Sequence, residues 1–228
     1  MMGVLDIRMA KKTTAGMARN SSARRQSTKK GPAKKAAASP GKLKSSKSPV
    51  QVLSSKLSYD GPLFQVYTDH IRENGVESRR DVVRHGGSVV ILAVDDARDK
   101  NNPLVIVERQ YRHAAGEYLL EIPAGKLEPG ESLLSGAKRE LLEETGFRAR
   151  RWRKLARYFA SPGFLGEWMQ VFVAHGLTAG PTRPDADEQI EIQKISLADL
   201  LRRIEEGKIH DGKTMNAVLL YDRLRRRV

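Results

Sequence analysis

The sequence contains no cysteine among its 228 residues. This absence excludes disulfides, thiolate zinc sites, iron–sulfur clusters and a cysteine nucleophile. No apolar run approaches the ~18 residues of a transmembrane helix, and the N-terminus lacks an apolar core of signal-peptide length. A chain without disulfides fits a reducing compartment, and with no transmembrane segment or signal peptide in the sequence we expect a soluble, cytoplasmic protein.

Acidic residues are almost missing from the first part of the chain. Residues 1–56 hold 14 Lys and Arg but one acid, Asp6, for a net charge of +13, whereas the remaining 172 residues balance to +1. The same segment has no aromatic residue and is rich in Ala, Lys, Ser and Pro. Such a segment cannot bury enough apolar surface to offset chain entropy, so we predict a disordered basic tail over 1–56. The folded domain is then predicted over 57–228.

The predicted tail is open to three interpretations. Its charge favours nonspecific binding to nucleic acid or another polyanion. It is equally compatible with a solubilising extension, or with a start codon placed too far upstream, since Met9 and Met17 are later candidates. A mitochondrial presequence is a third interpretation, which the lack of large apolar residues disfavours.

From residue 57 onward, strand signals outnumber helix signals. Asn74-Gly75 is a hairpin turn signal between two alternating segments. Ser132 and Gly146 are suitable caps for a helix over 132–145, and amphipathic helices are predicted over 197–206 and 213–227. Few helices separate the strands, so the pattern predicts an N-terminal hairpin followed by a mixed sheet with packed helices. The predicted strands cover 63–71, 78–85, 88–94, 104–111, 118–122, 152–159, 168–174 and 189–195.

Three carboxylates gather on the predicted helix over 132–145. Glu140, Glu143 and Glu144 fall within about 100° of arc, at the edge of an apolar helix face. A solvated acidic face is one interpretation, but like charges at this spacing repel, and a hard divalent cation is their natural partner. Glu131 is placed either to close onto the same ion or to orient Arg139.

The stretch Gly125-x5-Glu131-x7-Arg139-Glu140-Leu141-x-Glu143-Glu144-x-Gly146-Phe147 resembles the Nudix box at every defined position. The resemblance implies an α/β/α sandwich with a mixed sheet, Mg²⁺ or Mn²⁺ as cofactor, and hydrolysis of a nucleoside diphosphate linked to another moiety. It also implies metal ligation by the box glutamates and a structural role for Arg139 and Glu131 in the loop and helix. The implied metal ligands are Glu140, Glu143, Glu144 and the backbone carbonyl of Ala124.

Shorter segments around the box resemble the ADP-ribose pyrophosphatase branch of the Nudix superfamily. These segments are 84–89, 108–112, 121–125, 161–164 and 207–214. The resemblance implies hydrolysis of ADP-ribose or a related nucleotide sugar such as GDP-mannose. It also implies a homodimer in which the N-terminal hairpin packs across the two-fold axis. A nucleic-acid-tethered nucleotide-binding module is the alternative, but its expected mark is a broken box, and this box is intact.

Several charged residues outside the box are candidates for substrate contact and proton transfer. Arg109 and Arg112 end a predicted strand beside the box, where a guanidinium can bind phosphate with two parallel bonds, and Arg84 is a third candidate. A surface ion pair is the alternative for each arginine. The resembling branch takes its general base from a loop after the box, and we predict Glu167 in that role. Glu188 is then predicted as a metal or water ligand, with the two roles exchanged as the alternative.

The segment 207–214 also fits the P-loop pattern G-x4-G-K-[ST]. A P-loop follows a buried strand, whereas the preceding residues 197–206 have helical periodicity. We therefore predict that Asp211 caps the last helix and that no P-loop forms here.

Overall fold

The computed structural model describes residues 48–62, 64–180 and 189–226. These ranges form ten strands and three helices, and none of the helices in them is long and apolar enough to cross a membrane. In chain order the elements are β1 (Val50–Asp60), β2 (Gln65–Glu73), β3 (Val76–Arg84), β4 (Ser88–Asp95), β5 (Leu104–Arg112), β6 (Glu117–Glu121), β7 (Ala124–Lys126), α1 (Leu133–Thr145), β8 (Phe147–Phe159), β9 (Trp168–Ala179), β10 (Ile190–Ser196), α2 (Leu197–Glu205) and α3 (Gly212–Arg225).

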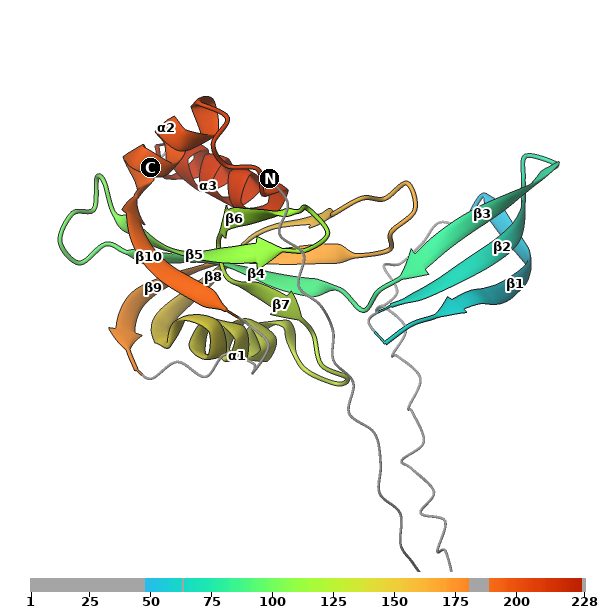
Figure 1. The fold of residues 1–228 in the computed structure, drawn as a ribbon, viewed down its shortest axis with the longest axis horizontal. Coiled ribbons are helices and arrows are strands. Elements are labelled where there is room, and N and C mark those ends of the chain that lie inside the picture. The colour runs from blue at the N-terminus through green and yellow to red at the C-terminus, as the bar shows by residue number, and fades with distance from the viewer. Residues whose placement is uncertain (1–47, 63, 181–188, 227–228) are drawn as a thin grey trace, which may run out of the picture. The chain divides into compact units, whose positions relative to one another are not determined.

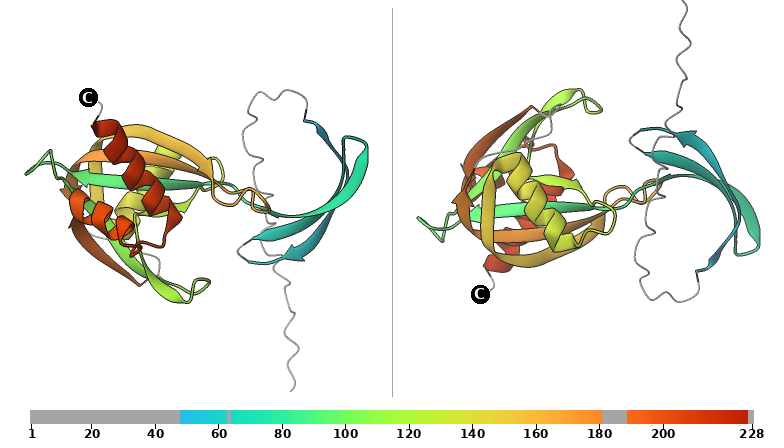
Figure 2. Two further views of the ribbon diagram at one scale, coloured as in Figure 1. Left: turned by 90° about the horizontal axis from the view of Figure 1, so that it is seen from above. Right: turned by 90° about the horizontal axis from the view of Figure 1, so that it is seen from below.

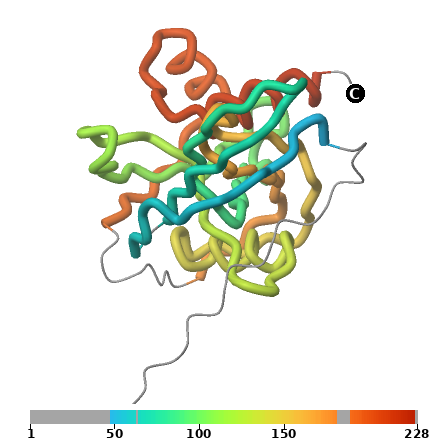
Figure 3. The backbone as a smooth tube through the Cα atoms, turned by 90° about the vertical axis from the view of Figure 1, so that its right-hand side faces the viewer, coloured from blue at the N-terminus to red at the C-terminus, as the bar shows by residue number. Residues whose placement is uncertain are grey.

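The first three strands form an antiparallel sheet in the order β1-β2-β3, drawn in blue to teal in Figure 3. β2 and β3 are joined by the turn at Asn74 and Gly75, whose φ angles are 51° and 81°. Positive φ at both central residues is the geometry that a two-residue hairpin with Asn-Gly favours. Val83 of β3 also pairs with Leu165, so this sheet contacts the loop before β9.

The predicted tail boundary at residue 56 is wrong, because β1 begins at Val50. Backbone pairing with β2 holds this strand, and the Ser55 hydroxyl donates to Asp69 at 2.5 Å. Most β1 side chains are exposed, so no apolar alternation marked the strand in the sequence. Residues 1–47, the rest of the predicted tail, lie outside the described ranges.

The second sheet is mixed and has the order β10-β5-β4-β9-β8, with β6 paired to β5 and β7 paired to β4 (Figure 1). β4 and β9 run parallel, whereas the other pairs are antiparallel. The predicted mixed sheet is therefore confirmed. The short strand β7 is not among the predicted strands, and β8 begins at Phe147 rather than at the predicted residue 152.

Helices cover both faces of this sheet, as Figure 2 shows from opposite sides. Alternate β4 residues face the two layers: Val89 and Ile91 belong to the core cluster that includes α1 residues Ala137 and Leu141. Val90 and the following alternate residues belong to the cluster that includes α2 and α3. The strand is buried on both faces and so reads as a continuous apolar run. The predicted α/β/α sandwich is confirmed.

Local capping sets the ends of the functional helices. The Ser132 side chain accepts from the amide of Ser135, and α1 ends at Gly146 with φ of 72°. The Asp211 side chain accepts from the amide of Thr214 at 2.9 Å, so Asp211 caps α3 as predicted. Helix α2 rather than a buried strand precedes this segment. The P-loop pattern therefore has no structural counterpart.

Candidate active site

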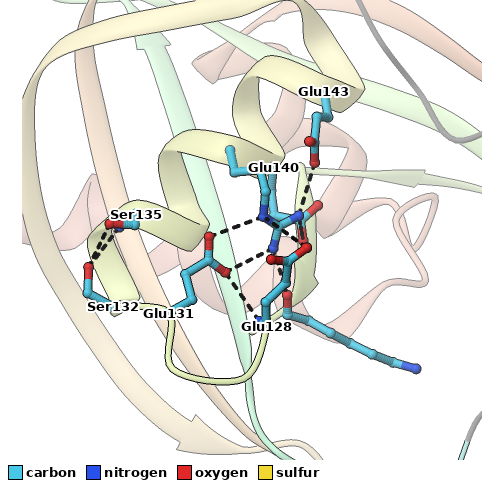
Figure 4. Close-up of polar contacts among 8 residues, drawn as sticks. Glu128, Glu131, Ser132, Ser135, Glu140 and Glu143 are labelled. Atoms are coloured by element: carbon cyan, nitrogen blue, oxygen red, sulfur yellow. Dashed lines mark hydrogen bonds and ion pairs between the residues drawn. The ribbon is translucent and has the colours of Figure 1, made fainter. Parts of the chain in front are cut away.

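Arg139 is the centre of the charged group on α1. Its Nε and Nη2 donate to the two carboxylate oxygens of Glu131, each at 3.1 Å, and Nη2 also donates to the Lys126 carbonyl at 3.0 Å. Its Nη1 lies 2.9 Å from both Glu140 Oε1 and Glu143 Oε2. Figure 4 shows Glu131, Glu140 and Glu143 directed toward one place. Hydrogen bonds from Arg139 hold the pKa of Glu131 below its usual range, against the opposing effect of partial burial.

The box carboxylates pack against β7. Glu140 and Glu144 are buried, with 9% and 6% exposure, and Glu144 Oε2 accepts from the Ala124 amide at 3.1 Å. A Cβ on Gly125 would lie 2.0 Å from the Glu140 carboxylate oxygen Oε1. The absence of a side chain at Gly125 therefore lets Glu140 lie against the strand backbone.

The predicted metal ligands have the right chemistry for a hard cation. The Glu140, Glu143 and Glu144 carboxylates and the Ala124 carbonyl supply oxygen donors, which Mg²⁺ and Mn²⁺ prefer. Within the described ranges, no three acidic or histidine side chains are arranged as a ready ion site. Arg139 is paired with two of these glutamates. Coordination by Glu140 and Glu143 thus requires their carboxylates to turn away from Arg139. Glu188 lies outside the described ranges.

Glu167, the predicted base, is held at the start of β4. The Ser88 hydroxyl donates to Glu167 Oε1 at 2.5 Å, and His85 Nδ1 lies 3.8 Å from the same oxygen. Burial lowers the pKa of His85 although the charge of Glu167 opposes this effect. The Gly87 amide donates to His85 Nδ1 at 3.1 Å, which fixes the proton of the neutral ring on Nε2.

Sheet register brings Glu167 and the box to the same end of β4. Ser88 pairs with Lys126 of β7, and Val89 pairs with Gly125, where Glu140 packs. In the parallel pairing with β9, Ser88 is opposite Met169, two residues after Glu167. The hydroxyl of Ser88 thus connects the predicted base to the strand beside the box. Sequence reasoning gave Ser88 no role.

Arg112 is held beside the box by a buried carboxylate. Its Nε and Nη2 donate to the two oxygens of Glu121 at 2.8 and 2.9 Å, and Glu121 is 1% exposed. Lys213 Nζ also donates to Glu121 and lies 3.2 Å from Asp211. Burial alone would raise the pKa of Glu121, but the bonds from Arg112 and the charge of Lys213 hold it below its usual range. The charge of Arg112 also acts on Glu144.

The other two predicted substrate arginines have partners elsewhere. Arg84 donates to Ser55 and Asp69 of the first sheet, at 2.8 and 3.1 Å. Arg109 lies over the Tyr118 ring at 3.9 Å and lines a groove of about 350 Å³ between β6, β10 and α2. Of the three arginines, Arg112 is therefore the one that the described contacts bring to the box.

Gly125→Ala is expected to lower kcat by about 10²-fold, because the new Cβ displaces the Glu140 carboxylate by an ångström or more. Unfolding temperature should change little, since the displaced group is the end of a side chain. Gly212→Ala is the matched control, since a Cβ there meets nothing within 4 Å. Wild-type kcat in Gly125→Ala would show that the close approach of Glu140 to the strand has no part in turnover.

Comparisons with known proteins agree with this geometry. A model of the NUDIX domain matches residues 84–217. The ADP-ribose pyrophosphatase of Bacillus subtilis is 34% identical over 171 residues, covering 74% of this chain and 90% of that protein. The GDP-mannose pyrophosphatase of Citrobacter koseri is 32% identical over 166 residues, covering 67% and 83%. The crystal structure of an ADP compounds hydrolase has the same fold, with a TM-score of 0.67, 24% identity and coverage of 78% and 94%.

Proposed function

This chain belongs to the Nudix hydrolase family, and we propose that it hydrolyses the diphosphate bond of ADP-ribose to AMP and ribose 5-phosphate with Mg²⁺. The resemblance carried by residues 125–147 is thus confirmed at the level of the family. One arrangement supports placing the reaction at this site. The carboxylates of the Nudix box pack against β7, with the positive charge of Arg112 beside them. The similarity to a curated ADP-ribose pyrophosphatase supports the substrate.

Each residue of the site has a chemical task in this proposal. Glu140, Glu143, Glu144 and the Ala124 carbonyl would hold Mg²⁺ or Mn²⁺, which supplies charge neutralisation of the diphosphate and a more acidic water. Arg112 binds a phosphate oxygen with the side of its guanidinium that does not face Glu121. Glu131 orients Arg139, and Arg139 in turn holds the loop before α1 through the Lys126 carbonyl.

The proposed reaction is a displacement at phosphorus. The oxygen of a water attacks phosphorus, its proton passes to the Glu167 carboxylate, and the bond between phosphorus and the leaving oxygen breaks. Glu167 is held for this task by Ser88, which occupies one carboxylate oxygen and leaves lone pairs on the other to accept a proton.

The similarity to a GDP-mannose pyrophosphatase favours a second candidate substrate, GDP-mannose. The decisive experiment incubates the full chain and Mg²⁺ with ADP-ribose, GDP-mannose, NADH, diadenosine polyphosphates and 8-oxo-dGTP, and measures the released phosphomonoesters. We expect the highest kcat/KM for ADP-ribose. A higher value for GDP-mannose would replace the substrate, and hydrolysis of none of them would overturn the proposed function.

We also propose that the protein is a homodimer formed through its first sheet. Apolar side chains stand exposed on this sheet, including Val52 at 56%, Tyr59 at 52% and Val76 at 68%. Sedimentation at micromolar concentration should show a dimer, and Val52→Asp should weaken it because burying an unpaired charge is costly. A fully active wild-type monomer at that concentration would contradict the proposal.

The +13 charge of residues 1–56 supports nonspecific polyanion contact through that segment. Deleting residues 1–47 leaves β1 whole and should not change kcat/KM for ADP-ribose. It should remove most salt-sensitive binding to DNA or RNA. A large change in specific activity would give the segment a role in turnover.

A further inference from the structure

Strand β8 carries an unusual density of positive charge. Its 13 residues include six cations and no acid, although residues 57–228 as a whole have a net charge of only +1. All six cationic side chains are exposed, and they are Arg148, Arg150, Arg151, Arg153, Lys154 and Arg157. We call these six residues the β8 cation row.

The β8 cation row lies at the edge of the mixed sheet, because β8 is the last strand in the sheet order. A rise of about 3.3 Å per residue spreads it over about 30 Å from Arg148 to Arg157. In the described part of the chain, Asp96 is the carboxylate paired with this strand, 3.6 Å from Arg151. Most of the row therefore keeps its charge available to a partner.

The last turn of α3 extends the positive surface. Arg153 of the row and Arg225 of α3 line one cavity of about 470 Å³, together with His175, Tyr221 and Leu224. Two acids lie nearby: Asp222 already pairs with Arg225 and Arg226, at 3.1 and 2.8 Å, and Asp96 lies 3.2 Å from His175. The surface thus stays basic where the strand and the helix meet.

We propose that the β8 cation row binds the sugar–phosphate backbone of a nucleic acid. Five of its six cations are arginines, whose planar donor fork fits phosphate oxygens. The six cations extend over about 30 Å along the edge and lie on both faces of the strand, so they can contact a phosphate backbone that runs along this edge, whereas a membrane surface favours apolar side chains among the cations. Between Arg148 and Arg157, every exposed side chain is cationic.

Charged side chains can also serve to keep a sheet edge from pairing with other chains. Protection of the edge and binding of a nucleic-acid backbone predict different results when the cations are removed. Protection of the edge needs only that the charge be present, and its loss would cause self-association. Backbone binding requires that each lost cation reduces the dependence of affinity on salt, by about 0.7 in the slope of log K against log salt for single strands.

The test uses the full chain and a single-stranded 30-nucleotide DNA over a range of salt concentrations. The row variant carries Arg148→Gln, Arg150→Gln, Arg153→Gln and Lys154→Gln. The control variant has the same change of net charge at four exposed cations that are not on β8: Arg98→Gln, Lys100→Gln, Lys138→Gln and Lys208→Gln. We expect the slope to become shallower by about 2–3 in the row variant and by less than one in the control, with kcat for ADP-ribose unchanged in both.

Equal slopes for the two variants would overturn the proposal. Self-association of the row variant with an unchanged slope would also overturn it and would assign the row to edge protection. A parallel measurement with phosphatidylserine vesicles addresses the membrane: if the row variant loses vesicle binding but keeps DNA binding, the partner is a lipid surface and the proposal fails.

Discussion

Glu167→Gln is expected to lower kcat by about 10²–10⁴-fold at saturating ADP-ribose and Mg²⁺, the usual cost of losing a general base. An amide oxygen at this position still accepts the hydrogen bond from Ser88, which the carboxylate now accepts at 2.5 Å. The substitution therefore removes the proton acceptor while keeping the position of the side chain. KM should change much less than kcat, because Glu167 is proposed to act on the water rather than on the substrate.

Glu188→Gln is the partner measurement, since Glu188 is the other acidic candidate in a loop after the box. We expect a smaller loss for it, together with a higher Mg²⁺ requirement. Ser88→Ala should lower kcat by less than Glu167→Gln, because it frees the carboxylate without removing it. A loss of 10²-fold or more in Glu188→Gln, with Glu167→Gln nearly unaffected, would exchange the two roles.

The parts of the site that lie close together in the sequence were predictable. Residues 125–147 contain the caps of α1, which follow from capping preferences, and the three glutamates on adjacent turns, which follow from helical geometry. The β4 strand was equally clear, because burial on both faces produces an unbroken apolar run.

The contacts that connect the site to the rest of the fold were not predictable. Glu121 and Lys213 are 92 residues apart, and Ser88 and Glu167 are 79 apart. Local periodicity cannot identify pairs that are so far apart in the sequence. The sequence analysis therefore named Glu121 only as part of the segment 121–125, which resembles the ADP-ribose pyrophosphatase branch. The bonds from Arg84 to Ser55 and Asp69 were likewise not predicted, because Ser55 belongs to a strand that the sequence analysis did not expect.

The net charge of residues 57–228 concealed the cluster of cations on β8. The balance of +1 over residues 57–228 suggested that the positive charge belongs to the N-terminal segment alone. It hid the concentration of six cations on one edge strand. Only the sheet order shows that this strand is at an edge, where its side chains are open to a large partner.

Glu144→Gln is expected to remove most turnover, by about 10²–10³-fold, which is the size of a lost transition-state charge contact. Glu144 is 6% exposed and accepts from the Ala124 amide at 3.1 Å, a bond that an amide oxygen can also accept. Glu140 lies four residues earlier on the same helix, so removing one charge also relieves a repulsion of a few tenths of a kcal/mol. The attraction between Arg112 and Glu144 is lost at the same time, so the unfolding temperature without Mg²⁺ should change little.

The Glu144→Gln measurement is a titration of kcat with Mg²⁺, accompanied by thermal unfolding without the metal. Glu128→Gln is its matched control, because it makes the same chemical change on the loop before α1, where Glu128 is 66% exposed and 4.0 Å from Arg139. Glu128→Gln should keep wild-type kcat and Mg²⁺ dependence. If Glu144→Gln keeps near-full activity at saturating Mg²⁺ and the same half-saturating concentration, then Glu144 is not a metal ligand, and its carboxylate serves only to bind the β7 backbone.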